Sequence, residues 1–231
     1  MERILPPGVA VGECFDDPPE ARLFPGEEAV VANAVAKRVR EYTTGRHCAR
    51  LALAGLGLPP TAVLTGPNRE PLWPAGVVGA VTHCDGYRAA AVARIGASES
   101  GGIISVGIDA EPHGPLPDGV LGTITREEEL PALARLSTEF PEIHWDRLTF
   151  SAKESIYKAW FPLAKRWLGF EDAALTFDAE KQTFEALLYR EGPLTSVSGR
   201  WRVQQGILVT SVVVSGRASG APAPGAASSA R

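Results

Sequence analysis

The sequence at residues 150–161 is FSAKESIYKAWF, and its apolar residues recur at the spacing of an amphipathic α-helix. The residues that share the apolar face are Ala152, Ile156, Ala159 and Trp160. We therefore expect a helix here with one face buried in a core and a polar face opposite.

The polar side of this helix has two interpretations. Glu154 and Lys158 are four residues apart, which is the spacing of an ordinary surface ion pair. Lys153 does not fit that account, because it projects off the polar face and its ammonium must reach solvent or meet an anion in a cleft. One carboxylate and two ammonium groups would suit a site that holds metal and phosphate together.

A second set of charges ends an expected strand about forty residues upstream, in the sequence GIDAE at residues 107–111. Side chains alternate along a strand, so Asp109 and Glu111 share one face with Gly107, which would leave space beside them. Adjacent like charges cost energy unless they are neutralised. Mg²⁺ answers this need, since it favours one or two carboxylates with substrate phosphates and waters. An isolated pair of this kind is more often a solvated strand end.

The other segments predict an α+β protein made of two similar halves. Helices are expected at 27–42, 46–56, 126–137 and 150–161, with the sequence TTG at 43–45 interrupting the first two. Strands are expected at 77–82, 87–95, 105–110, 173–177, 184–189, 201–205 and 207–214. Helices precede strands twice, which suggests halves at 1–102 and 103–215, although no residue-level repeat is visible. Residues 216–231 have the composition of a disordered tail.

Charge and composition exclude several classes of protein. The 231 residues carry a net charge of −4, which argues against a general nucleic-acid binder. No apolar run is long enough to span a bilayer, and no secretory signal is apparent. Three cysteines without a CxxC pair indicate reduced thiols and a cytoplasmic protein. The adjacent pairs His47-Cys48 and His83-Cys84 do not have the spacing of a zinc site.

Read together, VGIDAEP and FSAKESIYKAWFPL resemble the phosphopantetheinyl transferases, and more narrowly the larger, broad-specificity group with the surfactin-type and enterobactin-type enzymes. That group has a G-x-D-x-E strand end and a (F/W)-x-x-K-E-(S/A)-x-x-K-A helix. TGRHCARLAL and PNREPLWPAGVVGAVTHCDGY are also similar to family segments, so the resemblance covers about 27–170. HWDRLTFSAKESIYKAWFPLAKRWLGF resembles actinobacterial members in particular.

This sequence departs from the family pattern at two positions. Ala80 stands where such enzymes often have serine, and Ala110 separates Asp109 from Glu111, so only two acids are available on the strand. A third metal ligand would have to be Glu154, water or phosphate.

The resemblance implies a pseudo-twofold pair of α+β halves with coenzyme A in the cleft between them. It implies Mg²⁺ at Asp109 and Glu111, and we expect Glu154 as a third ligand or as the general base. Lys153 and Lys158 would assist on the phosphate side. A metal-bound water is the alternative base.

Coenzyme A would be bound mainly by the first half. The residues that the resemblance assigns to it are Arg46, Arg50, Asn68, Arg69, Glu70, Pro71, Thr82 and His83. Arg46 and Arg50 are like charges at i,i+4 near an expected helix N-terminus, an arrangement that an anion between them would explain. The alternatives are two solvated arginines, a generic turn at 68–71 and a histidine satisfied at a strand end.

The implied reaction transfers the phosphopantetheine arm of coenzyme A to a serine of an apo carrier protein, with release of adenosine 3′,5′-bisphosphate. Carriers of fatty acid, polyketide or nonribosomal peptide synthesis are all candidate partners, and neither nucleic acid nor membrane is expected. A coenzyme A-dependent acyltransferase is one rival, but it would not need the paired acids. A non-catalytic module that binds carrier proteins is another, but it would need neither the acids nor the lysines.

Overall fold

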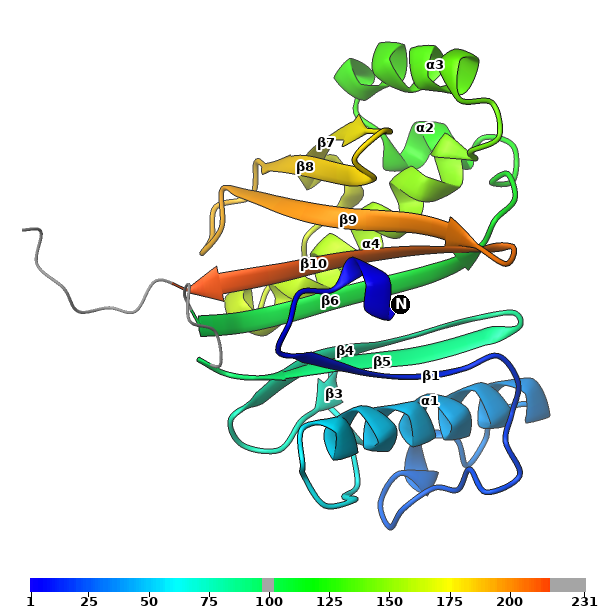
Figure 1. Ribbon diagram of the computed structural model, residues 1–231, viewed down its shortest axis with the longest axis vertical. Helices are drawn as coiled ribbons and strands as arrows, with labels where there is room; N and C mark the ends of the chain where they lie inside the picture. Colours follow the sequence, from blue (N-terminus) through cyan, green and yellow to red (C-terminus); the bar gives the residue numbers. More distant parts are fainter. Residues whose placement is uncertain (97–101, 217–231) are drawn as a thin grey trace, which may run out of the picture.

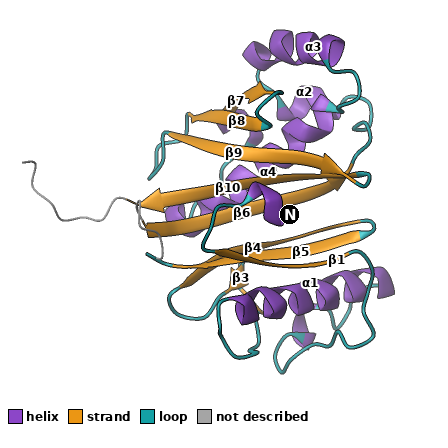
Figure 2. Cartoon of the chain, in the orientation of Figure 1, coloured by secondary structure: helices purple, strands orange, loops and turns teal. Residues whose placement is uncertain are grey.

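The computed structural model describes residues 1–96 and 102–216, which form two α+β halves (Figure 1). Each half has a long helix against one antiparallel sheet, as expected (Figure 2). The expected boundary between residues 102 and 103 falls at the first residue of β6 (Gly102–Pro112), and residues 97–101 before it lie outside the described residues. Gly216 is the last residue of a strand, so the predicted tail starts one residue too early, and 217–231 lie outside the described residues. Among the described residues no helix combines the length and apolarity required to cross a bilayer.

The first half is built on a three-stranded sheet with the order β1-β5-β4. Its strands are β1 (Val9–Cys14), β4 (Val77–Cys84) and β5 (Tyr87–Arg94). Helix α1 (Ala36–Gly55) packs on this sheet, and β2 (Leu64–Thr65) pairs with β3 (Pro71–Leu72) beside it. Two short 3₁₀ helices, η1 (Glu2–Ile4) and η2 (Glu28–Val30), precede α1.

The second half is built on a five-stranded sheet with the order β6-β10-β9-β8-β7. Its strands are β6 (Gly102–Pro112), β7 (Ala173–Asp178), β8 (Thr183–Leu188), β9 (Ser196–Gln204) and β10 (Ile207–Gly216). Its helices are α2 (Val120–Ile124), α3 (Leu130–Glu139) and α4 (Trp145–Ala164), with the 3₁₀ helices η3 (Glu127–Glu129) and η4 (Phe170–Asp172).

Two sequence predictions about the first half are wrong. The segment 43–45 does not interrupt a helix, because the Thr43 hydroxyl donates to the Val39 carbonyl inside a continuous α1 (2.7 Å). The helix begins only at Ala36, and the residues before it include η2 instead of helical turns. Strand β1 was not predicted at all, and it pairs with β5 along its whole length.

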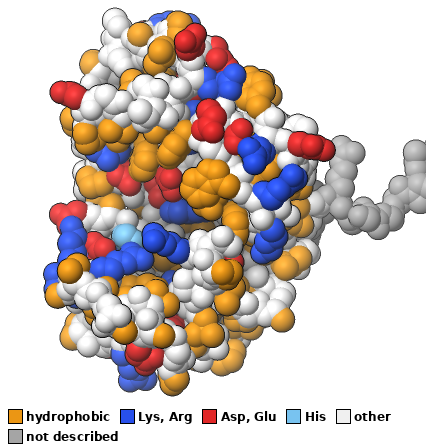
Figure 3. Space-filling model, turned by 180° about the vertical axis from the view of Figure 1, so that it is seen from behind, with side chains coloured by type: hydrophobic (Ala, Val, Ile, Leu, Met, Phe, Trp, Pro, Cys, Tyr) orange, Lys and Arg blue, Asp and Glu red, His pale blue; other side chains and the backbone are white. Residues whose placement is uncertain are grey.

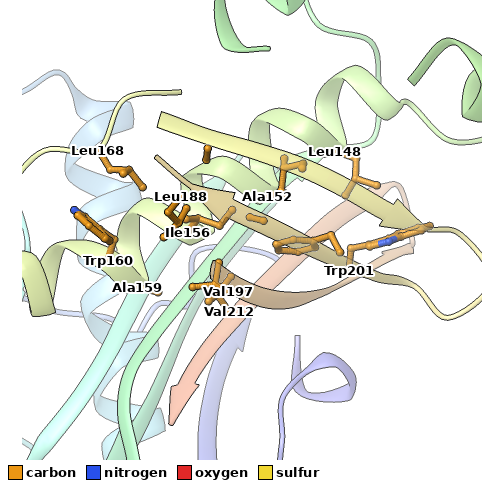
Figure 4. Packing of buried hydrophobic residues seen from close by; sticks show 14 of the residues in the cluster. Leu148, Ala152, Ile156, Ala159, Trp160, Leu168, Leu188, Val197, Trp201 and Val212 are labelled. Atoms are coloured by element: carbon orange, nitrogen blue, oxygen red, sulfur yellow. The ribbon is translucent and has the colours of Figure 1, made fainter. Parts of the chain in front are cut away.

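Three apolar clusters hold the fold together. In the second half, α4 packs on the five-stranded sheet, with Trp160 and Trp201 at opposite ends of the cluster and Ile156 between them (Figure 4). In the first half, Ala49, Ala52 and Leu53 of α1 pack against its sheet. The remaining cluster lies between the two sheets, where β4 and β5 pack against β6, and it joins the halves into one unit.

A glycine in each half lets a helix backbone approach a strand. A Cβ atom at Gly107 in β6 would overlap the carbonyl oxygen of Ser155 in α4, and one at Gly12 in β1 would overlap the carbonyl oxygen of Cys48 in α1. The interpretation of Gly107 as free space beside the carboxylates is therefore wrong, because α4 occupies that space.

We predict that Gly107→Ala lowers the free energy of unfolding by about 1–3 kcal/mol, the usual cost of overpacking a tight contact. The added methyl would lie 2.6 Å from the amide nitrogen of Ala159 and force α4 away from β6. Urea denaturation measures the change. Gly122→Ala is the control, because a Cβ there meets open space. Equal stability of the two variants would contradict this account of the close approach.

Candidate active site

A cleft between the two halves contains most of the predicted site. Its main cavity has a volume of about 640 Å³ and is lined by β4, α4 and the segment 68–73. Glu154 and Lys158 line it from α4, and the predicted residues Asn68, Arg69, Glu70 and Pro71 line it from the first half. Figure 3 shows acidic and basic side chains gathered around this hollow.

Asp109 is a buried carboxylate held by side chains from two neighbouring elements. Ser151 and Lys158 of α4 donate to it at 2.8 Å each, Ser151 to Oδ2 and Lys158 to Oδ1. Thr82 of β4 donates to Oδ1 at 3.1 Å and accepts from the amide of Ala110 at 3.0 Å. Thr82, predicted to meet coenzyme A, therefore fastens β4 to β6 beside Asp109.

Glu111 shares a strand face with Asp109, as predicted, and forms an ion pair with Arg147 of α4 (2.9 Å). Burial and the charge of Asp109 raise the pKa of Glu111, and Arg147 opposes this shift. The sequence analysis missed Arg147. Its spacing was the available signal, since Arg147, Ser151, Glu154 and Lys158 recur at helical intervals along one face of α4.

Glu154 lies on the same face of α4 and is partly buried. Burial raises the pKa of its carboxyl, Lys158 lowers it, and the charge of Asp109 raises it again. The carboxylate therefore faces the cleft as a stronger base than an ordinary glutamate.

The acids of the cleft fit a hard divalent cation only in combination with a substrate. Among residues 1–96 and 102–216, no three Asp, Glu, His or Cys side chains are close enough to hold an ion alone. Lys158 and Arg147 instead neutralise Asp109 and Glu111. Burial raises the pKa of Glu111 and of Glu154, and the charge of Asp109 adds to both shifts, so a cation close to these carboxyls would favour their ionised forms. Mg²⁺ needs only one or two carboxylates when phosphates complete its shell.

Lys153 does not reach the cleft. Its ammonium is buried against Glu129 (2.7 Å) and the carbonyl oxygen of Phe170 (3.0 Å) inside the second half. The lysine does meet an anion, as its position predicted, but the anion is a carboxylate of the protein. The structure thus separates it from Glu154 and Lys158, with which it was grouped as a catalytic residue.

A second cavity of about 520 Å³ adjoins the first and shares Arg69, Pro71 and Val81 with it. Arg46 lines it from α1, donates to the Thr65 hydroxyl (2.8 Å) and stacks on Tyr42 (4.3 Å). The buried Nε of Arg46 has no hydrogen-bond partner among the described residues. This orphaned donor is an observation that an anion in the cavity would explain.

His83 and Arg38 form the basic wall of the second cavity. Their ring Nε2 and guanidinium Nη1 are 2.8 Å apart, so the imidazole accepts. Burial lowers the pKa of His83, and the charge of Arg38 lowers it further. The ring is therefore neutral near pH 7. Arg38 was missed by the sequence analysis, because a basic residue near a helix start carries no distinctive signal.

Arg50 was paired with Arg46 in the sequence analysis, but the structure separates them. Arg50 donates to both oxygens of the buried Glu27 (3.0 and 3.1 Å) and does not line the second cavity. Both arginines lie well inside α1, so the prediction that they are close to a helix N-terminus is wrong.

Comparison with known proteins agrees with the geometry of the cleft. Residues 26–93 match the 4′-phosphopantetheinyl transferase N-terminal domain, and residues 105–210 match the 4′-phosphopantetheinyl transferase superfamily. The chain belongs to this family.

Its similar relatives include actinobacterial phosphopantetheinyl transferases, as the sequence resemblance suggested. The chain is 46% identical to PptT of Mycobacterium tuberculosis over 216 residues, 89% of this chain and 92% of PptT. It is 47% identical to Svp of Streptomyces mobaraensis over 220 residues, 91% of this chain and 87% of Svp. Enterobactin synthase component D of Escherichia coli O157:H7 is 28% identical over 182 residues, 79% of this chain and 80% of that protein.

Membership confirms the predicted class of enzyme. Phosphopantetheinyl transferases use coenzyme A to modify carrier proteins, and this chain is a transferase of that kind. The α+β fold with two halves, predicted before the structure, is confirmed as well.

We predict that Glu154→Gln stabilises this transferase at neutral pH. A folded-state pKa above the unfolded value means that the stabilising contribution exists below the unfolded pKa and is lost as pH rises through the folded pKa. Wild type at pH 7 therefore carries an unfavourable charge that glutamine removes, and Tm should rise by about 2 °C.

Thermal melts at pH 7 and at pH 4.5, the ordinary pKa of glutamate, measure this effect. The difference between variant and wild type should shrink at the lower pH. Glu142→Gln, at an exposed position, is the control and should change neither melt. A lower Tm for Glu154→Gln at pH 7 would show that the ionised carboxylate stabilises the fold.

Proposed function

We propose that this phosphopantetheinyl transferase requires Mg²⁺ and moves the arm of coenzyme A to a serine hydroxyl of an apo carrier protein. The observation that supports this most is the arrangement of one cleft, where Glu154 and Lys158 line the main cavity and Asp109 lies behind Lys158, bound to its ammonium. Glu111 follows Asp109 on the same strand face, and Arg38 and Arg46 line the adjoining cavity. A pyrophosphate substrate placed between the acids and the bases would satisfy both.

The second cavity suits the nucleotide end of coenzyme A. Arg46, Arg38 and His83 offer donors to phosphate, and Arg46 has an unused one. The first cavity suits the pantetheine arm, because Trp73, Tyr157 and Trp167 give it an apolar lining. Asn68, Arg69, Glu70 and Pro71 form the turn where the two cavities meet, and the Glu70 carboxylate accepts from the amide of Asn68 (2.9 Å).

Asp109 and Glu111 would hold Mg²⁺ against the pyrophosphate, with Glu154 as a further ligand. Magnesium would there neutralise the charge that develops on the leaving phosphate. Lys158 lies between Asp109 and the cavity, so its ammonium would meet the same phosphate. The serine oxygen forms a bond to the β-phosphorus, and the bond from that phosphorus to the bridging oxygen breaks. Glu154 accepts the serine proton where it is not itself a metal ligand, because a bound cation would cancel the rise in pKa that burial gives its carboxyl.

The rival activities fit the cleft less well. An acyltransferase acts on the thioester of coenzyme A and would have no use for Asp109 and Glu111 beside a phosphate-binding cavity. A module that only binds carrier proteins would not need those acids either. Carriers of fatty acid, polyketide or nonribosomal peptide synthesis are all proposed partners, and the proposed location is the cytoplasm.

A transfer assay tests the proposal. The protein is mixed with coenzyme A, Mg²⁺ and a panel of apo carrier proteins, and intact mass records any gain of the phosphopantetheine arm. Excess chelator should stop transfer, and added Mg²⁺ should restore it. Asp109→Asn should lower the rate by roughly a hundredfold or more, because the position loses its charge but keeps its shape. Asp118→Ala, at an exposed position, should not. Full activity in chelator would refute the metal requirement.

A second measurement concerns the 3′-phosphate of coenzyme A, which Arg46 would bind in the second cavity with its unpartnered Nε. Arg46→Ala should raise KM for coenzyme A by about tenfold, the value of one charge-assisted contact to phosphate. KM for dephospho-coenzyme A should change little, so the preference between the two substrates shrinks. Arg135→Ala on the exposed side of α3 is the control. Equal losses for the two substrates would mean that Arg46 does not contact the 3′-phosphate.

A further inference from the structure

We infer that two equivalent buried ion pairs, Glu27–Arg50 and Glu129–Lys153, position the two walls of the cleft. The first pair determines the shape of the second cavity, called the nucleotide cavity below. The second pair determines which face of α4 lies toward the reacting groups. This inference rests on the proposed function for its kinetic part, and on geometry alone for the rest.

The pair in the first half is built around Glu27, which is fully buried. Its carboxylate accepts from Arg50 of α1 at 3.0 and 3.1 Å. It also accepts from the backbone amides of Phe24 (2.7 Å) and Val63 (2.8 Å). One carboxylate thus connects the segment before α1, the helix itself and the segment after it.

The pair in the second half has the same connections. Glu129 accepts from Lys153 of α4 (2.7 Å) and from the backbone amides of Arg126 (2.7 Å) and Leu175 (2.8 Å). Both side chains of the pair are 2% exposed. Lys153 also donates to the carbonyl oxygen of Phe170.

The two pairs correspond in chain order as well as in contacts. Each glutamate lies between the first strand of the half's sequence and its long helix, and accepts from an amide three residues before it. Each also accepts from an amide that follows the helix. Arg50 follows Glu27 by 23 residues and Lys153 follows Glu129 by 24. This is a residue-level repeat of the two halves, and the sequence hides it because arginine replaces lysine.

The first pair acts on the nucleotide cavity through two short paths. Val63, held by Glu27, precedes Thr65 by two residues, and the Thr65 hydroxyl receives Arg46 and contacts the Tyr42 hydroxyl. On its other side Glu27 is followed directly by η2, which carries Val30 to the cavity wall. Loss of the pair would release both sides of this cavity.

The second pair acts on the catalytic face of α4. Lys153 is the residue before Glu154 and points to the other side of the helix, so its ion pair fixes the rotation of α4 about its axis. Its bond to Phe170 also holds the segment that carries Lys165 and Trp167 along the main cavity. Lys153 lines neither cavity, so it acts through its neighbours and is a positioning residue.

Neutral double variants test this assignment. Glu27→Gln with Arg50→Met, and Glu129→Gln with Lys153→Met, remove both charges of a pair, so that neither leaves an unpaired charge in the interior. Calorimetry measures Kd for coenzyme A, and intact mass measures kcat at saturating substrate. Asp178→Asn with Lys181→Met removes an exposed ion pair and is the matched control.

The two variants should affect different quantities. The Glu27 and Arg50 variant should raise Kd for coenzyme A by about tenfold and Kd for dephospho-coenzyme A by less, because Arg46 is released, and should keep kcat within about twofold. The Glu129 and Lys153 variant should lower kcat by about tenfold and keep Kd within about twofold. Arg50→Lys and Lys153→Arg keep the charge. The first should keep Kd close to the wild-type value, and the second should keep kcat close to it. If a double variant does not fold, Glu27→Asp and Glu129→Asp, which keep the charge but shorten the reach of the carboxylate, decide by the same split between Kd and kcat.

Three results would overturn the inference. One is a change of Kd and kcat together in proportion to lost Tm, which a merely structural pair would give. Another is a rise of Kd on loss of Lys153, which a direct phosphate ligand would give. The third is a Kd for coenzyme A that stays within about twofold of wild type when Glu27 and Arg50 are both replaced. If wild type transfers to no carrier, the proposed function fails, yet calorimetry still tests the first pair.

Discussion

The structure of the cleft depends on a buried carboxylate, Asp109, which would be prohibitively costly to bury without partners. It receives one hydrogen bond from Thr82 of the first half and two from α4 of the second. Because a charge in the interior must be matched, these three donors are fixed relative to one another. Strand β4, strand β6 and helix α4 therefore meet at the Asp109 carboxylate, and the cleft lies beside it. The same side chain that organises the site is the one proposed to serve its metal.

Both halves contribute charges of both signs to the cleft. Glu41 and Glu70 line it from the first half together with Arg38 and Arg46, and Lys158 and Lys165 line it from the second half together with Glu154. Without substrate, Asp109 and Glu111 are neutralised by Lys158 and Arg147, and the neutral His83 accepts from Arg38. A substrate with several phosphates would replace the protein groups as the hydrogen-bond and ion-pair partners of these cations. The site is thus organised before it binds, which spares the cost of ordering it at that moment.

The sequence predicted which charged side chains share a face better than it predicted how the elements pack. Alternation along β6 correctly placed Asp109 and Glu111 together, because the period of a strand is a local property. The helix period likewise placed Glu154 and Lys158 on one face. Lys153, Arg50 and Gly107 were misread, since each is explained by a partner distant in sequence: Glu129, Glu27 and the backbone of α4. Strand β1 was missed because its short run has no turn signal that pairs it with β5.

The apolar cluster between the two sheets has a consequence for the cleft. Ile103, Val106 and Ile108 of β6 share one dry core with Ala89, Ala91 and Ala93 of β5. Two lobes that share a core move as a single body, unlike lobes joined by a polar interface. Opening or closing the cleft by moving one half against the other would therefore require this shared core to be disrupted. The packing of β4 and β5 on β6 thus sets the distance between the two walls of the cleft.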